Sequence, residues 1–474
     1  MAAGSQRVAV VGGGITGLAA AHALCTGTGN DNDNGNDNGN DNGNGNGLGV
    51  QVTVFESDDR LGGKLRTSPF AGHPGIDEGP DAFLARLPWG TALATALGLP
   101  LVSPQAGRAA VWWDALHPIP EGLLLGMPTE VMALARSRLL SWPGKLRAAT
   151  EPLRRRTSLE PDSLGGFVRA RFGSEIHLRL VDPLVGSIYA ADTDHFSLAA
   201  VPQIADLAGK GRSVLLTGRK MPKPPANAGP VFYAPRDGMG ALALATASAA
   251  TAAGAELRTN TPVQAVERDG KGWRVDGEHF AAVLLAAPAA AAGRLLRQPV
   301  PAAATTLAAI PSADVAMVTI ALDAGDWPRG LIGMSGYLVP KPKQRLVTAV
   351  SFGSQKWSHW ELPSSVVLRV SLGRDGLAVL HLSDEQLLAA AIDEVGHHLG
   401  LTLQPQHARV SRWPGAFPQY RPHHAARVAA AEQALPAGLA IAGASYHGIG
   451  VPACIRSAQQ AAAALHTFLQ TVAD

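Results

Sequence analysis

The chain has 474 residues, of which 46% are hydrophobic and 16% charged, and its formal net charge is +2. This length exceeds that of one compact core and predicts two or three structural units, while the small net charge excludes a general electrostatic attraction to nucleic acid. Two cysteines, Cys25 and Cys454, cannot form a disulfide framework, and they favour a reducing, cytoplasmic setting.

The first motif predicts a dinucleotide-binding loop. RVAVV (7–11) is a short β-branched run, typical of a buried parallel strand, and an apolar, Ala-rich run begins at Leu18. The Gly-x-Gly-x-x-Gly pattern between them allows a tight turn, close approach of a pyrophosphate and close helix packing. The residues of this loop are Gly12, Gly13, Gly14, Ile15, Thr16 and Gly17.

A tract rich in Gly, Asn and Asp (26–49) interrupts this unit. QVTVFE (51–56) fits the second strand, and Glu56 at its end is the expected ribose-binding acid. The motif usually has this acid about 20 residues after the loop, and the excess here is about the length of the tract. We therefore place the tract in the loop between the first helix and the second strand, where length matters little, and expect it to be disordered.

Later stretches carry a resemblance to a known family. SDDRLGGKLRT (57–67) and GIDEGPDAFLAR (75–86) follow the acid, and GLAIAGASYHGIGVPACIRSAQQAAAAL (438–465) has the pattern of a strand, a glycine-rich loop and a helix. With the first loop and VDPLVGSIYAADTDHFSLAAVP (181–202), they resemble the protoporphyrinogen/coproporphyrinogen oxidases of the flavin amine oxidase superfamily, in the Gram-positive coproporphyrin-forming type. The resemblance covers nearly the whole chain.

The resemblance implies a non-covalent FAD. The first loop would hold the pyrophosphate, Glu56 and Ser57 the adenosine ribose, and Lys64 would lie near the phosphates. Cys454 is expected to be a small buried thiol and not an attachment point for flavin. Members of the mitochondrial type carry Arg where Asp81 stands, as it does in the Gram-positive type, so the resemblance implies no substrate-carboxylate role at this position. The other expected cofactor contacts are Gly79, Pro80, Asp81, Ala82, Val263, Trp413, Ile449, Gly450 and Val451.

The expected fold class is α/β, with a split Rossmann-like FAD-binding domain, a mixed α+β substrate domain and a helical domain. The FAD-binding domain would comprise residues 1–104, with the insertion 26–49, and residues 225–305 and 411–474. Residues 105–224 would form the helical domain and residues 306–410 the β-rich substrate domain.

The resemblance implies an FAD-dependent oxidase that acts on CH–CH groups. It would convert coproporphyrinogen III to coproporphyrin III in haem biosynthesis, with dioxygen as acceptor and hydrogen peroxide as product. A protoporphyrinogen IX oxidase, or another flavin oxidoreductase such as an amine oxidase or a carotenoid desaturase, stays an alternative. Arg108 is the expected substrate-facing residue, the basic run at 210–220 is more typical of a solvated loop, and no catalytic residue is predicted.

The expected partners are a porphyrinogen and dioxygen, with neither nucleic acid nor a metal. The adjacent pairs His397-His398 and His423-His424 lack the i,i+4 spacing of a helical metal site, and we interpret them as surface or helix-end residues. The basic stretch 137–156 with Trp142 would suit a peripheral membrane helix, but a solvated helix face is preferred. A cytoplasmic location is expected, and a peripheral membrane contact and a hand-off to ferrochelatase both stay open.

Overall fold

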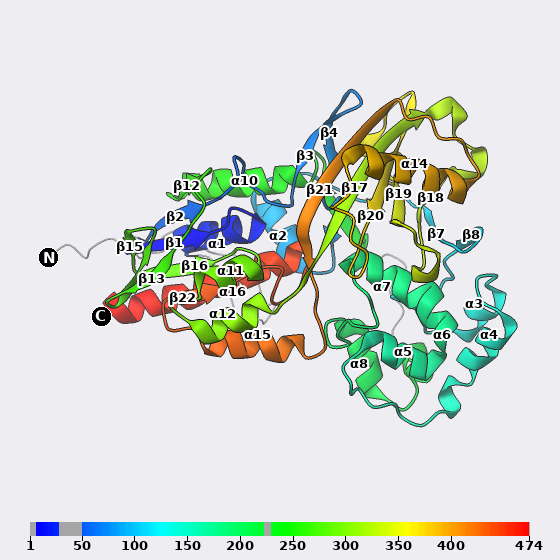
Figure 1. Ribbon diagram of the computed structural model, residues 1–474, viewed down its shortest axis with the longest axis horizontal. Coiled ribbons are helices and arrows are strands. Elements are labelled where there is room, and N and C mark those ends of the chain that lie inside the picture. The colour runs from blue at the N-terminus through cyan, green and yellow to red at the C-terminus, as the bar shows by residue number, and fades with distance from the viewer. Residues whose placement is uncertain (1–5, 28–49, 222–228, 474) are drawn as a thin grey trace.

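The computed structural model describes residues 6–27, 50–221 and 229–473 (Figure 1). Apart from Thr26 and Gly27, the predicted insertion lies outside these residues. The unit with the predicted dinucleotide-binding loop, called the nucleotide-binding unit below, occupies the left of Figure 1, a β-rich unit the upper right, and a helical unit the lower right. The predicted α/β architecture is therefore confirmed.

The nucleotide-binding unit is built on a five-stranded parallel sheet in the order β12-β2-β1-β16-β22. Three of these strands, β1, β2 and β16, are short apolar runs with buried residues on both faces, as a parallel sheet between two helix layers requires. The strands are β1 (Arg7–Val11), β2 (Gln51–Phe55), β12 (Glu256–Arg258), β16 (Ala282–Leu285) and β22 (Leu439–Ile441).

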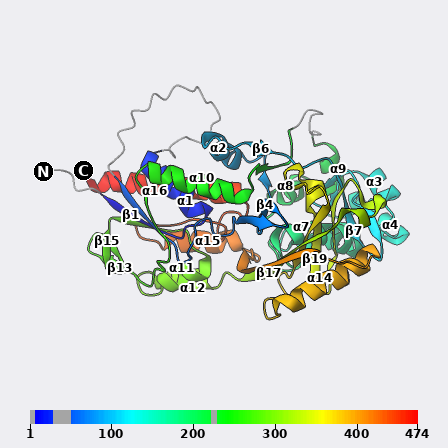
Figure 2. The same cartoon turned by 90° about the horizontal axis from the view of Figure 1, so that it is seen from above.

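Helices and a small sheet cover the two faces of the parallel sheet, as Figure 2 shows from above. One face packs against α1 (Ile15–Thr26), α10 (Met239–Ala252) and α16 (Val451–Ala473). The other packs against α11 (Ala289–Leu295), α12 (Pro301–Ala308), α15 (His424–Gln433) and an antiparallel sheet of β13 (Val266–Asp269), β14 (Gly272–Val275) and β15 (Glu278–Phe280).

The β-rich unit is a seven-stranded sheet in the order β21-β17-β20-β19-β18-β7-β8. Its pairings are antiparallel except that of β7 with β18, and α14 (Asp384–Leu399) packs on one face. The strands are β7 (Arg108–Trp112), β8 (Leu116–Pro118), β17 (Ser312–Asp323), β18 (Met334–Leu338), β19 (Val347–Phe352), β20 (Ser365–Leu372) and β21 (His407–Pro418), and α13 (Gly353–Lys356) follows β19.

Short helices between residues 131 and 219 pack around a second apolar core. They are α3 (Val131–Arg136), α4 (Trp142–Ala149), α5 (Leu164–Phe172), α6 (Ser174–Ile176), α7 (Asp182–Tyr189), α8 (Pro202–Lys210) and α9 (Val214–Arg219). The connections between units carry α2 (Pro88–Ala96), β3 (Thr67–Phe70), β4 (His73–Asp77), β5 (Phe83–Leu84), β6 (Leu101–Val102), β9 (Leu123–Leu124), β10 (Met127–Pro128) and β11 (Phe232–Pro235).

Two of the expected domain boundaries differ from those in the structure. Residues 108–118, assigned to the helical domain, form β7 and β8 of the large sheet, because β7 pairs with β18 from more than 200 residues away. Residues 411–418, assigned to the FAD-binding domain, continue β21, whose ladder with β17 runs from His407 to Pro418. Pairing with a distant strand thus outweighed the local sequence pattern.

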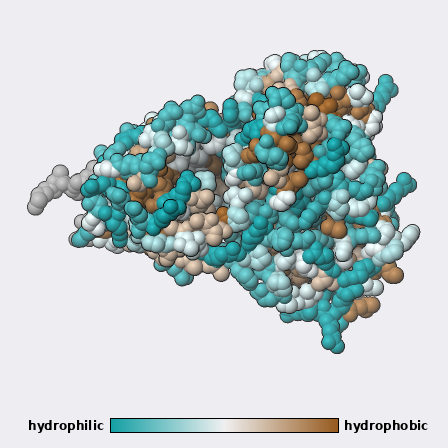
Figure 3. All heavy atoms as spheres, in the orientation of Figure 1, coloured by the Kyte–Doolittle hydropathy of each residue, from teal (hydrophilic) through white to brown (hydrophobic). Residues whose placement is uncertain are grey.

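The surface seen in Figure 3 is mainly hydrophilic, with apolar residues gathered over the β-rich unit and, to a lesser extent, over the nucleotide-binding unit. Within the described ranges, no helix is both long enough and apolar enough to cross a bilayer.

Candidate functional site

The first glycine loop follows β1, and each of its glycines is constrained differently. Gly12 has a φ of +112°, which favours glycine. An added Cβ at Gly17 would lie 1.9 Å from the carbonyl oxygen of Gly12, so only glycine lets α1 approach the turn this closely. A Cβ at Gly14, by contrast, would meet no atom within 4 Å. The loop is therefore closely packed at Gly12 and Gly17, whereas the space beside Gly14 is open.

Glu56 joins this loop to the end of β2. Its buried carboxylate accepts hydrogen bonds from the backbone N–H of Gly13 at 2.6 Å and of Asp58 at 2.9 Å, and from the Ser57 hydroxyl at 3.1 Å. The second glycine turn lies against the first, because the N–H of Gly62 donates to the carbonyl of Gly13 at 2.8 Å. The acid and both glycine turns thus form one local structure.

These elements open into a cavity of about 1510 Å³. It lies at the carboxyl ends of β1, β2, β16 and β22, where ligands bind in open α/β sheets. Gly13 and Gly17 do not line this cavity, but all the other expected cofactor residues do. These are Gly12, Gly14, Ile15, Thr16, Glu56, Ser57, Lys64, Gly79, Pro80, Asp81, Ala82, Val263, Trp413, Ile449, Gly450 and Val451.

The C-terminal loop forms a further part of the cavity wall and lies beside the first glycine loop, because an added Cβ at Gly443 would be 3.3 Å from the hydroxyl oxygen of Thr16. It leads into α16, whose N-terminus at Val451 carries partial positive charge. The Tyr420 hydroxyl fixes the loop, since it donates to the carbonyl of Ala444 at 2.6 Å and accepts from the N–H of Gly448 at 2.9 Å. Cys454 is buried, and burial raises the pKa of its thiol, so it is a poor nucleophile at neutral pH.

Beyond these loops the cavity extends between the large sheet and the helical unit. Its walls there include Met317 of β17, Leu338 of β18 and Tyr189 of α7. An ordinary ligand pocket measures about 300–1,000 Å³, so this cavity has room for a cofactor and a second large ligand side by side.

Several cavity residues were missed by sequence reasoning. Arg369 is a charge inside the apolar run of β20, a pattern that could have marked it, whereas Lys356 gave no local signal. His424 lines the cavity and stacks on Tyr420 with ring centroids 3.9 Å apart, and burial lowers its pKa to about 4. Both histidine pairs lie at helix ends, in agreement with the interpretation as surface or helix-end residues, since His397 and His398 are in the last turn of α14 and His424 begins α15; His398 and His424 are buried.

Arg108 is exposed at the start of β7 and is not one of the cavity-lining residues. It pairs in register with Met334, at the opposite end of β18 from the cavity residue Leu338. A contact between Arg108 and a substrate therefore stays a prediction.

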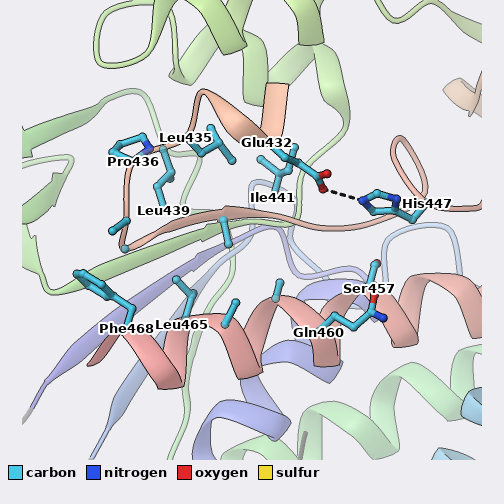
Figure 4. Close-up of a pocket in the computed structure, with 15 residues that line it drawn as sticks. Glu432, Leu435, Pro436, Leu439, Ile441, His447, Ser457, Gln460, Leu465 and Phe468 are labelled. Carbon is cyan, nitrogen blue, oxygen red and sulfur yellow. Dashed lines mark hydrogen bonds and ion pairs between the residues drawn. The ribbon is translucent and has the colours of Figure 1, made fainter. Parts of the chain in front are cut away.

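A second, smaller pocket of about 430 Å³ lies beside the edge strand β22, between the end of α15 and α16 (Figure 4). Apolar side chains such as Leu435, Leu465 and Phe468 line it, and the ion pair between Glu432 and His447, with Oε1 and Nε2 2.6 Å apart, stands at one end. This lining offers few polar groups for chemistry.

Comparison with known proteins identifies the family. Residues 15–466 match the family described as flavin containing amine oxidoreductase. The chain belongs to this family. The resemblance to the flavin amine oxidase superfamily is thereby confirmed. The cavity also suits a flavin cofactor that carries phosphates, because the space at Gly14 is open and the N-terminus of α1 adjoins it.

Individual relatives align over nearly their whole length. The chain is 34% identical to the coproporphyrinogen III oxidase of Mycobacterium leprae (strain TN), with 97% of this chain and 98% of the relative covered. Human protoporphyrinogen oxidase is 28% identical, with 96% and 98% covered. A crystal structure from Exiguobacterium sp. 255-15, provisionally named a protoporphyrinogen oxidase, has a TM-score of 0.83 at 29% identity and covers 98% of this chain and 99% of its own.

The Gly14→Ala variant tests the glycine cradle. We expect its flavin affinity to fall by about tenfold or more, equivalent to at least ~1.4 kcal/mol, because the new methyl group would occupy the open space at the loop. The melting temperature of the flavin-free protein should not change, since no protein atom lies within 4 Å of the added carbon. Flavin titration and thermal melts measure both quantities.

Gly209→Ala is the matched control, because Gly209 of α8 also has open space around an added Cβ but lies outside the cavity. Unchanged flavin affinity in Gly14→Ala would show that the cofactor phosphates do not lie at this loop.

Proposed function

We propose that this flavin oxidoreductase binds FAD non-covalently and oxidises coproporphyrinogen III to coproporphyrin III, with dioxygen as acceptor and hydrogen peroxide as product, in haem biosynthesis. The observation that carries the proposal is the continuous cavity of about 1510 Å³, which runs from the dinucleotide-type loops to the large sheet and can hold a macrocycle beside a cofactor. The name of the Mycobacterium leprae relative supports the same substrate.

The residues around the loops would hold FAD as follows. Backbone N–H groups at the start of α1 would face the pyrophosphate, Glu56 would accept hydrogen bonds from the ribose, and Val263 would lie against the adenine. Bound FAD would supply the capacity to accept a hydride and pass electrons to dioxygen. The buried Cys454, whose thiol donates to the carbonyl of Ile449 at 3.8 Å, supports a non-covalent cofactor.

The cavity walls would bind and orient the substrate. The part formed by the sheet and helices carries apolar side chains such as Met317, Leu338 and Ile188, which suit a flat macrocycle. Oxidation at the sp³ bridges needs no nucleophile or metal from the protein. The protein would therefore contribute orientation and exclusion of water.

Protoporphyrinogen IX is the alternative substrate, because the human relative and the Exiguobacterium structure both carry the name protoporphyrinogen oxidase. It has two propionates where coproporphyrinogen III has four. Both macrocycles would present the same apolar faces to the cavity, so the difference between them lies in the number of carboxylates that meet cations.

A peripheral membrane contact is a separate proposal, based on α4 and its neighbours. Trp142 is 77% exposed and Leu146 68% exposed. Glu151 is the one acidic residue of the stretch 131–156. It is buried in an ion pair with Arg171, so it does not neutralise the exposed basic side chains. Exposed arginines accompany the apolar side chains: Arg136, Arg138, Arg154, Arg155 and Arg156. A basic surface with an exposed Trp suits an anionic lipid surface.

The first test concerns FAD. We expect acid precipitation to release all of the flavin as FAD, and Glu56→Ala to weaken FAD binding by ~1.5–3 kcal/mol, the contribution of a charge-assisted hydrogen bond. Equilibrium dialysis measures the affinity, and Glu56→Gln, which keeps the volume, separates loss of charge from loss of packing. Flavin retained in the precipitate, or unchanged affinity in Glu56→Ala, would contradict the proposal.

The second test concerns the porphyrinogen. We expect kcat/KM for coproporphyrinogen III to exceed that for protoporphyrinogen IX by roughly two- to fivefold, since one carboxylate contact at a partly wet rim contributes ~0.5–1 kcal/mol. Steady-state fluorescence of the porphyrin product measures both. A clear preference for protoporphyrinogen IX would reject coproporphyrinogen III as the favoured substrate.

The third test concerns the membrane contact. Sedimentation with vesicles that contain anionic phospholipid should recover the protein in the pellet, and a Trp142→Ser, Leu146→Ser double variant should bind several-fold less. Leu244→Ser, which removes an exposed leucine from α10 of another unit, is the control. Equal recovery with purely zwitterionic vesicles, or of the double variant, would argue against the contact.

A further inference from the structure

A charged cluster lies where the nucleotide-binding unit meets the large sheet. Asp81 is its centre: one carboxylate oxygen accepts hydrogen bonds from Lys356 Nζ at 2.9 Å and Trp357 Nε1 at 3.0 Å. The guanidinium of Arg369 lies 3.5 Å from the same oxygen and also donates to the carbonyl of Gly79. The pKa of the Asp81 carboxyl is held well below its usual range by Lys356 and Arg369, although burial opposes this. Asp81 is therefore ionised, and one of its oxygens holds both cations.

The charges around Asp81 do not cancel. Among the described residues of this cluster, Arg66, Lys356, Arg369 and Arg409 face the carboxylates of Asp77, Glu78 and Asp81, which leaves one positive charge in excess. Burial raises the pKa of Asp77 to about 6, so this carboxyl is still mostly ionised at neutral pH and counts as negative. His359 adds no charge at neutral pH, because burial lowers its pKa to about 4.

Part of this cluster faces the cavity. Of its charged residues, Lys356 and Arg369 line the cavity together with Glu78 and Asp81, whereas Arg66 and Arg409 do not. The side chain of Arg369 is 4% exposed, and that of Lys356 is 23% exposed. An ammonium has three N–H donors, and the structure gives Lys356 one acceptor, Asp81. Of the two cations of this cluster that line the cavity, Lys356 is therefore the one that a ligand can reach.

The position of Lys356 is fixed before any ligand arrives. Lys356 ends α13, and its backbone carbonyl accepts from the N–H of Gln105 at 2.8 Å. The next residue, Trp357, is fully buried. Asp81 holds the ammonium from the other side. A preorganised ammonium loses little freedom when it binds an anion, so the contact favours affinity.

We propose that Lys356, positioned by Asp81, binds a carboxylate of the substrate inside the cavity and so determines specificity for porphyrinogens that carry acidic side chains. This rests on the proposed function, because it takes the substrate to be a carboxylated macrocycle. The carboxylate is one that coproporphyrinogen III and protoporphyrinogen IX share, so Lys356 acts on both, and the preference between them arises from the additional propionates.

The test compares holoenzyme variants with two porphyrin probes in one detergent buffer. Coproporphyrin III carries four carboxylates, and its tetramethyl ester carries none. Fluorescence titration of wild type should show tighter binding of the acid than of the ester. In Lys356→Met the affinity for the acid should fall about 10- to 100-fold, as for a lost charge-assisted hydrogen bond, while the affinity for the ester stays within about twofold. Lys356→Arg should retain most of the difference.

Lys343→Met is the matched control. Lys343 also pairs with one aspartate, Asp114, at 2.6 Å, but it is not a cavity residue, so its loss should leave both affinities unchanged. Flavin content, the visible flavin spectrum and the melting temperature are recorded for each variant. Lys356→Gln replaces Lys356→Met if the latter does not fold.

Three results would overturn the role of Lys356. Equal loss of acid and ester binding would show that the lysine only supports the cavity wall. An altered flavin spectrum with unchanged porphyrin binding would assign the lysine to the cofactor. Unchanged binding of both probes in the variant would leave the proposed function intact without Lys356, whereas wild type that binds neither probe would overturn the proposed function as well.

Discussion

The site depends on one close approach, between Gly17 of α1 and the carbonyl of Gly12. Because an added Cβ at Gly17 would lie 1.9 Å from that oxygen, this turn cannot form with any larger residue in its present geometry. The approach brings the start of α1 to the end of β1, and Gly62 and Glu56 then bond to the same loop through the backbone of Gly13. Protein atoms pack closely against the loop at Gly12, Gly13 and Gly17, and the space beside Gly14 stays open.

The other half of the cavity follows from the meeting of three units. The parallel sheet ends in loops, the large sheet contributes strands β17 to β20, and α7 of the helical unit closes the remaining side. Residues far away in the sequence hold the cavity wall at the end of α7. The carbonyl of Ala190 accepts a hydrogen bond from the N–H of Asp375 at 2.8 Å, and the carbonyl of Tyr189 accepts one from Gln419 Nε2 at 3.2 Å. Units far apart in sequence thus determine the shape of one binding site.

The part of the cavity formed by the glycine loops could be predicted from the sequence residue by residue, because its motifs are encoded locally. A glycine loop, the acid after the second strand and the loop before α16 each occupy a short stretch, and these stretches all reach the cavity. The other half could not be derived in this way. Residues 108–118 look unremarkable until β7 pairs with β18, and Lys356 acquires its role only when α13 comes to rest beside Asp81. Such contacts depend on long-range topology, which local patterns do not contain.

Asp81 shows how an acidic residue can place cations in a binding cavity. Since members of the mitochondrial type are expected to carry an arginine directly after the Gly-Pro pair, the aspartate of this chain suggests at first that the site lacks a cation. The structure shows instead that Asp81 gathers two cations from elsewhere, Lys356 from α13 and Arg369 from β20. A buried carboxylate is tolerated only when it is paired and hydrogen-bonded, so Asp81 fixes the cations that pair with it. A negative residue can therefore place cations at the cavity wall, here Lys356 with N–H donors still available to a ligand.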